Sequence, residues 1–153
     1  MNPKNSIIVN VLSFDKFIKQ AVSMNTIATI VLFVLDKKME ETTLMPVIKR
    51  VLDIGGEYFL SYGINADPVH DLFDDVILAE QFSKYGSNYD PPLDQVVMTT
   101  AHVNDSAEEV IFFLLNATIR KNQEYRFLIL HNEKGTFIDE IKKAAEGMGL
   151  LIQ

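Results

Sequence analysis

The stretch that decides the fold is Ala28–Leu35, which reads ATIVLFVL and is followed at once by Asp36. A continuous run of aliphatic and β-branched residues is typical of a central parallel strand, because helices cover both of its faces. Three further apolar runs predict strands, at Glu57–Leu60, Gln95–Met98 and Tyr125–Leu130. A stretch with helical periodicity follows each run, so the chain is predicted to consist of βαβ units.

Local signals extend this pattern to both ends of the chain. Ser6–Leu12 and Leu150–Ile152 are β-rich and predict two more strands. Helix starts are predicted at five places, which are Ser13, Thr42 or Thr43, Asp67-Pro68, the Ser106–Glu109 capping box and Thr136. We therefore expect a single α/β domain over residues 1–153, in which residues 1–26 are a strand–helix addition to a core of residues 27–153. Its architecture is predicted to be a three-layer α/β/α sandwich with a mainly parallel five- or six-stranded sheet, Rossmann-like or flavodoxin-like.

The composition excludes several classes of protein. Apolar residues make up 48% and charged residues 23% of the chain, which is typical of a folded globular protein. The formal charge of −7 repels phosphate backbones, so no nucleic-acid partner is predicted. The lack of cysteine excludes disulfides, thiolate nucleophiles and cysteine metal sites.

The lengths of the apolar segments also predict where in the cell the protein resides. The longest apolar stretch, residues 27–35, is far shorter than the roughly 20 residues of a membrane helix. Asn10 and Asp15 interrupt any apolar segment of a signal peptide. We therefore expect a cytoplasmic protein with no membrane partner.

Polar side chains follow the predicted strands at the point where each strand ends. Parallel strands end at the same edge of a sheet, and open α/β folds bind their ligands there. The ligand-binding candidates at this edge are Asp36, Ser61, Tyr62, His70, Asp71 and Asn132. The catalytic candidates are His102, His131, Thr99 and Thr100, because an imidazole can transfer protons near neutral pH and a hydroxyl can attack or bind a substrate. None of the spacings is a metal-ligand motif, so no metal site is predicted, and the cofactor remains unknown.

The chain contains no G-x-G-x-x-G, Walker loop, G-x-S-x-G elbow or H-E-x-x-H. The leading interpretation is therefore a ligand-binding or protein-interaction module that uses the polar strand-end edge. The alternative is a small hydrolase or transferase that uses His102 and His131, with or without a metal. Two or more of Asp36, His70, His102 and His131 within bonding distance of one another would favour the enzyme.

Two segments predict self-association. The first is a helix with six consecutive apolar residues, which are Val110, Ile111, Phe112, Phe113, Leu114 and Leu115. A helix that is apolar all round must be covered on both sides, by the N-terminal segment or by a second subunit. The second is the connection Ser83–Asp94, whose Tyr85 and Tyr89 predict either a loop packed over the sheet edge or a lid or subunit contact.

Two resemblances add to this reading. Val96–His102 (VVMTTAH) resembles the switch strand of response-regulator receiver domains. Ser61-Tyr62 stands where a receiver carries its phospho-acceptor aspartate, and His131-Asn132 stands where it carries a lysine. This resemblance therefore implies at most a degenerate receiver-like signalling domain.

A broader resemblance, over roughly Thr29–Leu130, is to a group of small uncharacterised bacterial α/β domains. The residues that carry it are Tyr58-Phe59-x-x-Tyr62-Gly63, His70-Asp71-x-x-Asp74, Met98-Thr99-Thr100-x-His102 and Glu108-Glu109-x-x-Phe112-Phe113. The resemblance implies a bacterial origin and an α/β fold. No activity comes with it.

Overall fold

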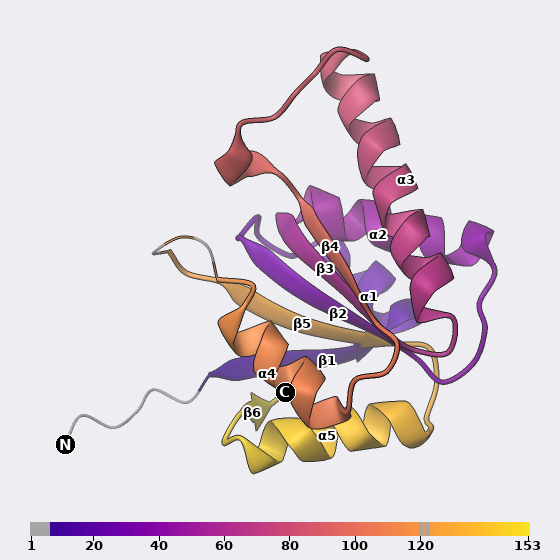
Figure 1. Ribbon diagram of the computed structural model, residues 1–153, viewed down its shortest axis with the longest axis vertical. Coiled ribbons are helices and arrows are strands. Elements are labelled where there is room, and N and C mark those ends of the chain that lie inside the picture. Colours follow the sequence, from indigo (N-terminus) through magenta and orange to yellow (C-terminus); the bar gives the residue numbers. More distant parts are fainter. Residues whose placement is uncertain (1–6, 120, 122) are drawn as a thin grey trace.

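The computed structural model describes residues 7–119, 121 and 123–153. Its centre is a six-stranded, fully parallel sheet in the order β4-β3-β2-β5-β1-β6 (Figure 1). The strands are β1 Ile8–Ser13, β2 Thr29–Leu35, β3 Gly56–Gly63, β4 Met98–His102, β5 Arg126–His131 and β6 Leu151–Ile152. The helices are α1 Phe14–Ala21, α2 Glu41–Asp53, α3 Ala66–Tyr85, α4 Ala107–Asn116 and α5 Thr136–Gly147, with a 3-10 turn at Leu93–Gln95. The predicted three-layer α/β fold is confirmed.

The core consists of two apolar layers, one on each face of the sheet. Helices α1, α2 and α3 cover one face, where the ring of Phe33 lies 4.9 Å from that of Phe73 and 5.4 Å from that of Phe14. Helices α4 and α5 cover the other face. All seven residues of β2 are buried, as expected of a strand covered from both sides.

The route of the chain fixes where a ligand crevice can form. The connections that leave β1, β2 and β3 pass over the face of α1, α2 and α3, whereas those that leave β4 and β5 pass over the other face. Neighbouring strands therefore send the chain to opposite faces at three places, between β3 and β4, β2 and β5, and β5 and β1. Such switch points are where open α/β sheets form crevices at the carboxyl ends of their strands.

Most predicted elements lie within a few residues of their observed positions, and β4 is the exception. The strand predicted at Gln95–Met98 begins only at Met98, because residues Leu93–Gln95 form the 3-10 turn. Thr99–His102, expected to follow the strand, form it instead, since they pair in register with Phe59–Tyr62 of β3. Position in the sheet, set by the neighbouring strand, outweighs the local apolar signal here.

The helix starts show which local signals are reliable. Ser13 caps α1 by accepting the amide of Lys16, and Ser106 and Glu109 form the predicted capping box of α4. Helix α3 begins at Ala66 after Asn65, two residues earlier than a cap at Asp67 and a first helical residue at Pro68 indicate.

Strand β1 lies between β5 and β6, so the predicted N-terminal addition forms part of the sheet. The division of the chain at residue 26 stays a prediction. None of the helices in the described parts of the chain has the length and apolar character needed to cross a bilayer.

Candidate functional site

The crevice between β2 and β5 is filled by the protein's own side chains. The carboxylate of Asp36 accepts the backbone amides of Phe137 (2.7 Å) and Ile138 (3.1 Å), so it occupies the N-terminus of α5. The Asn132 amide ties the two strand ends together, because its oxygen accepts the Asp36 amide (3.0 Å) and its nitrogen donates to the Lys37 carbonyl (2.8 Å). The helix N-terminus that could hold an anionic group thus already holds a carboxylate.

His131 lies at the end of β5, between β2 and β1. Its Nδ1 is buried and has no hydrogen-bond partner among the described residues. Burial lowers the pKa of His131 below its ordinary 6.5, against the backbone of Glu133 and the Asp36 carboxylate, which raise it, while the Lys142 and Lys16 ammonium groups lower it further. The ring is therefore neutral at neutral pH.

Two clusters of polar side chains lie at the switch point between β3 and β4, on the two faces of the edge strand β4. On the α3 face, the Thr99 hydroxyl donates to Oδ1 of Asp74 (2.6 Å) and lies 3.0 Å from Nε2 of His70. Nδ1 of His70 lies 3.3 Å from the carboxylate of Asp71. The predicted candidates Thr99, His70 and Asp71 are thus brought together.

On the α4 face, the second cluster is a chain of three groups. The Thr100 hydroxyl lies 3.0 Å from Nε2 of His102, and Nδ1 of His102 lies 2.7 Å from Oδ2 of Asp105. The His102 side chain is 5% exposed and Asp105 is 45% exposed, so the chain runs from the interior to the surface. We call the two clusters together, His70, Asp74, Thr99, Thr100, His102 and Asp105, the edge site.

Ser61 and Tyr62 are built into the core rather than the edge site. The buried Ser61 hydroxyl donates to the carbonyl of Ala66 at 2.7 Å and so fixes the start of α3. The Tyr62 ring packs edge-on against Phe137 at 5.3 Å. Burial, together with the nearby Glu140 carboxylate, raises the pKa of the Tyr62 hydroxyl. Both residues therefore have structural partners.

The structure does not bring the three histidines together. Strands β3 and β2 separate His102 on β4 from His131 on β5, which amounts to about 14 Å at ordinary strand spacing. In the described part of the chain, no bond joins any two of Asp36, His70, His102 and His131. Nor does any group of three or more His, Asp or Glu among the described residues lie close enough to hold a metal ion.

Sequence reasoning missed Asp74 and Asp105, although local spacing could have found both. Asp74 follows His70 by four residues in α3, a spacing that places two side chains on one helix face. Asp105 follows His102 by three residues, which places its carboxylate within reach of the imidazole. The capping role belongs to Ser106, which leaves the Asp105 carboxylate free to bond the imidazole.

Two cavities lie near the edge site. One, of about 480 Å³, runs along α4, contacts Asp105 and is lined by Glu108, Glu109, Phe112, Phe113 and Met148, among others. The other, of about 190 Å³, lies between the N-terminal ends of α2 and α3, where Lys38 and Asn65 contribute to its wall. The structure adds these lining residues to the sequence-based candidates.

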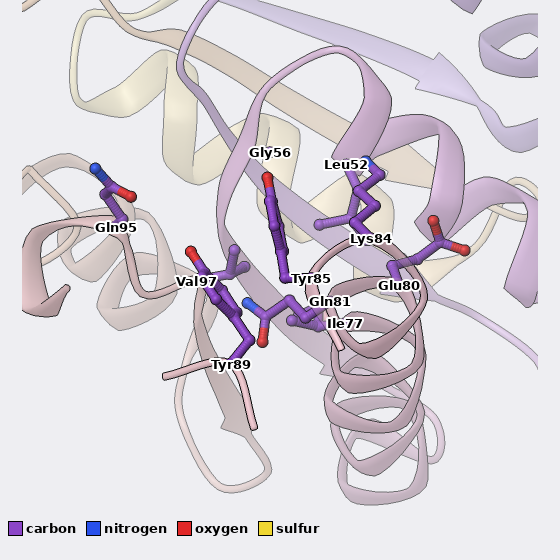
Figure 2. Close-up of a pocket in the computed structure, with 10 residues that line it drawn as sticks. All are labelled: Leu52, Gly56, Ile77, Glu80, Gln81, Lys84, Tyr85, Tyr89, Gln95 and Val97. Carbon is purple, nitrogen blue, oxygen red and sulfur yellow. The ribbon is translucent and has the colours of Figure 1, made fainter. Parts of the chain in front are cut away.

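A third cavity, of about 220 Å³, lies at the amino ends of β3 and β4, where the predicted loop Ser83–Asp94 folds (Figure 2). The rings of Tyr85 and Tyr89 stack at 4.3 Å and line this cavity side by side. Leu93, in the same connection, is 89% exposed. The loop therefore packs partly over the sheet edge and leaves an apolar side chain in solvent.

The apolar helix α4 is mostly covered by its own chain. Val110, Ile111 and Leu114 are buried in the core, and Phe113 and Leu115 pack against it. Phe112 is the member of the run that faces solvent, at 62% exposure. The sheet, rather than a second subunit, accounts for most of the apolar character of this helix.

The comparisons with known proteins give a family and no activity. A family model described as "Domain of unknown function (DUF7684)" matches residues 11–147. No curated protein and no solved structure matches the chain. The receiver-like resemblance stays a prediction.

Proposed function

Because the chain belongs to this family of domains of unknown function, its role has to come from its own geometry, and we propose that it is a ligand-binding module that holds a small molecule at the edge site. One observation carries the proposal. Thr99 and Thr100, adjacent on β4, present hydroxyls to opposite faces of the sheet, and each lies 3.0 Å from an imidazole nitrogen. Oriented donors and acceptors at a switch point are the usual elements of a ligand crevice.

The other switch points support this choice. Asp36 and Asn132 fill the crevice between β2 and β5, and His131 is enclosed between β5 and β1. The edge site, by contrast, keeps solvent-exposed polar groups, since Asp74 is about half exposed and Asp105 nearly so. The separation of the three histidines favours a binding module over an enzyme that pairs His102 with His131.

The charge of the site indicates the class of ligand. Its ionisable groups other than the two imidazoles are the carboxylates of Asp74 and Asp105, with Asp71 beside them. The chain as a whole carries a formal charge of −7. A neutral or cationic molecule with several hydrogen-bonding groups fits this environment, whereas an anion is repelled.

A thermal-shift screen of neutral, cationic and anionic metabolites tests the proposal. A ligand at 100 times its Kd adds about 2.7 kcal/mol, which raises the Tm of a domain of this size by roughly 5–10 °C. We expect neutral or cationic hits whose shift is lost in Thr99→Val or Thr100→Val and kept in His131→Gln. A shift that survives both threonine variants would place the ligand elsewhere.

Self-association belongs to the proposal as well. Two segments were predicted to self-associate, helix α4 and the connection Ser83–Asp94. The second leaves the more exposed apolar surface, which consists of Phe82 and Tyr85 at the end of α3 and Leu93 in the following loop. We propose that copies of the chain meet through this surface, which we call the loop surface. The cytoplasmic location stays a prediction.

A further inference from the structure

The groups Thr100, His102 and Asp105 form a hydroxyl–imidazole–carboxylate chain with bonds of 3.0 and 2.7 Å. A carboxylate can only accept a hydrogen bond, so the proton between His102 and Asp105 lies on Nδ1 of the ring. Nε2 of the neutral ring is then an acceptor for the Thr100 hydroxyl. This is the bonding order in which an imidazole removes a proton from an attacking hydroxyl.

The surroundings hold this chain in place. The ring of Phe113 packs edge-on against His102 at 4.8 Å and against Tyr58 at 6.1 Å, which fixes the plane of the imidazole. Asp105 directly precedes Ser106, whose capping box anchors the start of α4. The three groups are therefore preorganised by packing and by a helix cap.

The cluster on the other face of β4 has the opposite bonding order. The Thr99 hydroxyl donates its hydrogen bond to the Asp74 carboxylate at 2.6 Å. His70 can therefore only donate a hydrogen bond to the Thr99 oxygen. Thr99 is thus a hydroxyl on the same strand, one residue away, that is not activated by a base.

The cavity along α4 gives the class of substrate. Of the three groups, Asp105 lines this cavity. Phe113, whose ring packs against His102, gives it an apolar lining together with Phe112 and Met148. Glu108 and Glu109 also line it, so a negatively charged group is disfavoured. The cavity suits a short apolar acyl chain on an uncharged or cationic molecule.

We propose that the edge site catalyses acyl transfer from uncharged or cationic esters with a short apolar acyl chain, with Thr100 as nucleophile, His102 as general base and Asp105 as positioning residue. The inference rests on the proposed function in one respect, because the ester has to bind at the edge site.

The step is balanced without a cofactor. The Thr100 oxygen bonds to the carbonyl carbon while its proton passes to Nε2 of His102, and the ester C–O bond breaks as the leaving alcohol takes that proton. Water then attacks the acyl-threonine and gives a proton to His102; the bond between the acyl carbon and the Thr100 oxygen breaks, that oxygen takes the proton back from His102, and the acid is released. Ester and water thus become acid and alcohol.

The experiment is incubation of the full chain with p-nitrophenyl butyrate, with intact-mass analysis and peptide mapping. We expect one butyryl group on Thr100 and release of nitrophenolate, with the rate lowered about 100-fold or more in Thr100→Val and in His102→Gln. Asp105→Asn should lower the rate with little change in KM, since it acts through the ring. An ester with an anionic acyl chain should react more slowly.

The controls separate this chemistry from the background reactivity of imidazoles and amines. His131→Gln, which lies outside the edge site, should react like the parent protein. A label on another residue, or an unchanged rate in Thr100→Val, overturns the catalytic inference. If the thermal-shift screen still finds ligands that depend on Thr99 and Thr100, only the catalytic inference fails. If it finds none, the proposed function fails with it.

Discussion

At the scale of single residues, Asp36 caps a helix that begins one hundred residues later in the chain. Gly135, directly before α5, has no side chain, and a Cβ there would overlap with Cγ and Oδ1 of Asp36. The backbone of Gly135 is extended, so any residue could adopt its conformation. Position 135 is therefore restricted by the neighbouring carboxylate and not by its backbone.

A double-mutant cycle tests this restriction. Gly135→Ala should lower the free energy of unfolding by about 1–3 kcal/mol, since the new methyl group overlaps with Asp36. In an Asp36→Gly background, the same change should cost clearly less, because the overlapping atoms are gone. Urea unfolding of the four proteins measures both costs. Equal costs in the two backgrounds would contradict the steric explanation.

His131 provides a pH-dependent prediction. Its folded pKa lies below the unfolded value of 6.5, mainly through burial, with Lys142 and Lys16 adding to the effect and Asp36 opposing it. As the pH falls below about 6.5, the unfolded state takes up the proton first, so stability is lost until the folded pKa is passed. Above about pH 6.5, the full contribution of the neutral His131 to the free energy of unfolding is present.

We expect the free energy of unfolding of the parent protein to fall more between about pH 7.5 and about pH 5 than that of His131→Gln. Urea titrations at the two pH values give the difference. A variant that loses as much stability as the parent would show that His131 does not contribute.

At the scale of elements, signals contained in one segment were predictable and signals shared between segments were not. The Ser13 cap and the Ser106–Glu109 box depend on residues three apart, and both helices start where these signals indicate. The position of β4 depends on its register with β3, which the sequence of β4 does not contain. The cluster on the α3 face could not be assembled either, because Thr99 and His70 meet only through the packing of α3 on β4.

The loop surface leads to a prediction about assembly. Leu93 is 89% exposed, and large apolar side chains that become buried at the centre of an interface dominate its energy. Leu93→Asp should weaken self-association about tenfold or more in sedimentation velocity, while Phe112→Asp on α4 should leave it unchanged. A parent protein that stays monomeric at high concentration would rule out this surface as a self-association site.

At the scale of the whole molecule, the strand order explains why only one switch point is left for a ligand. The central strands β2 and β5 diverge to opposite faces, and their carboxyl ends are linked by Asp36 and Asn132. The edge strand β4 has a neighbour on one side only, and its Thr99 and Thr100 are only half-buried. The apolar runs predicted the layers of the fold. Which crevice stays open, however, depends on the strand order and on the long-range hydrogen bonds of Asp36 and Asn132.

The same strand order has a consequence for synthesis of the chain. Of the six strands of the sheet, β1 is the first to leave the ribosome, yet its neighbours β5 and β6 are the last two to be made. Strands β2, β3 and β4 can pair as they emerge, whereas the apolar flank of β2 and the whole of β1 wait for residues 126–131. A nascent chain that halts before this segment exposes open strand edges, which is the form most prone to aggregate or to recruit a chaperone.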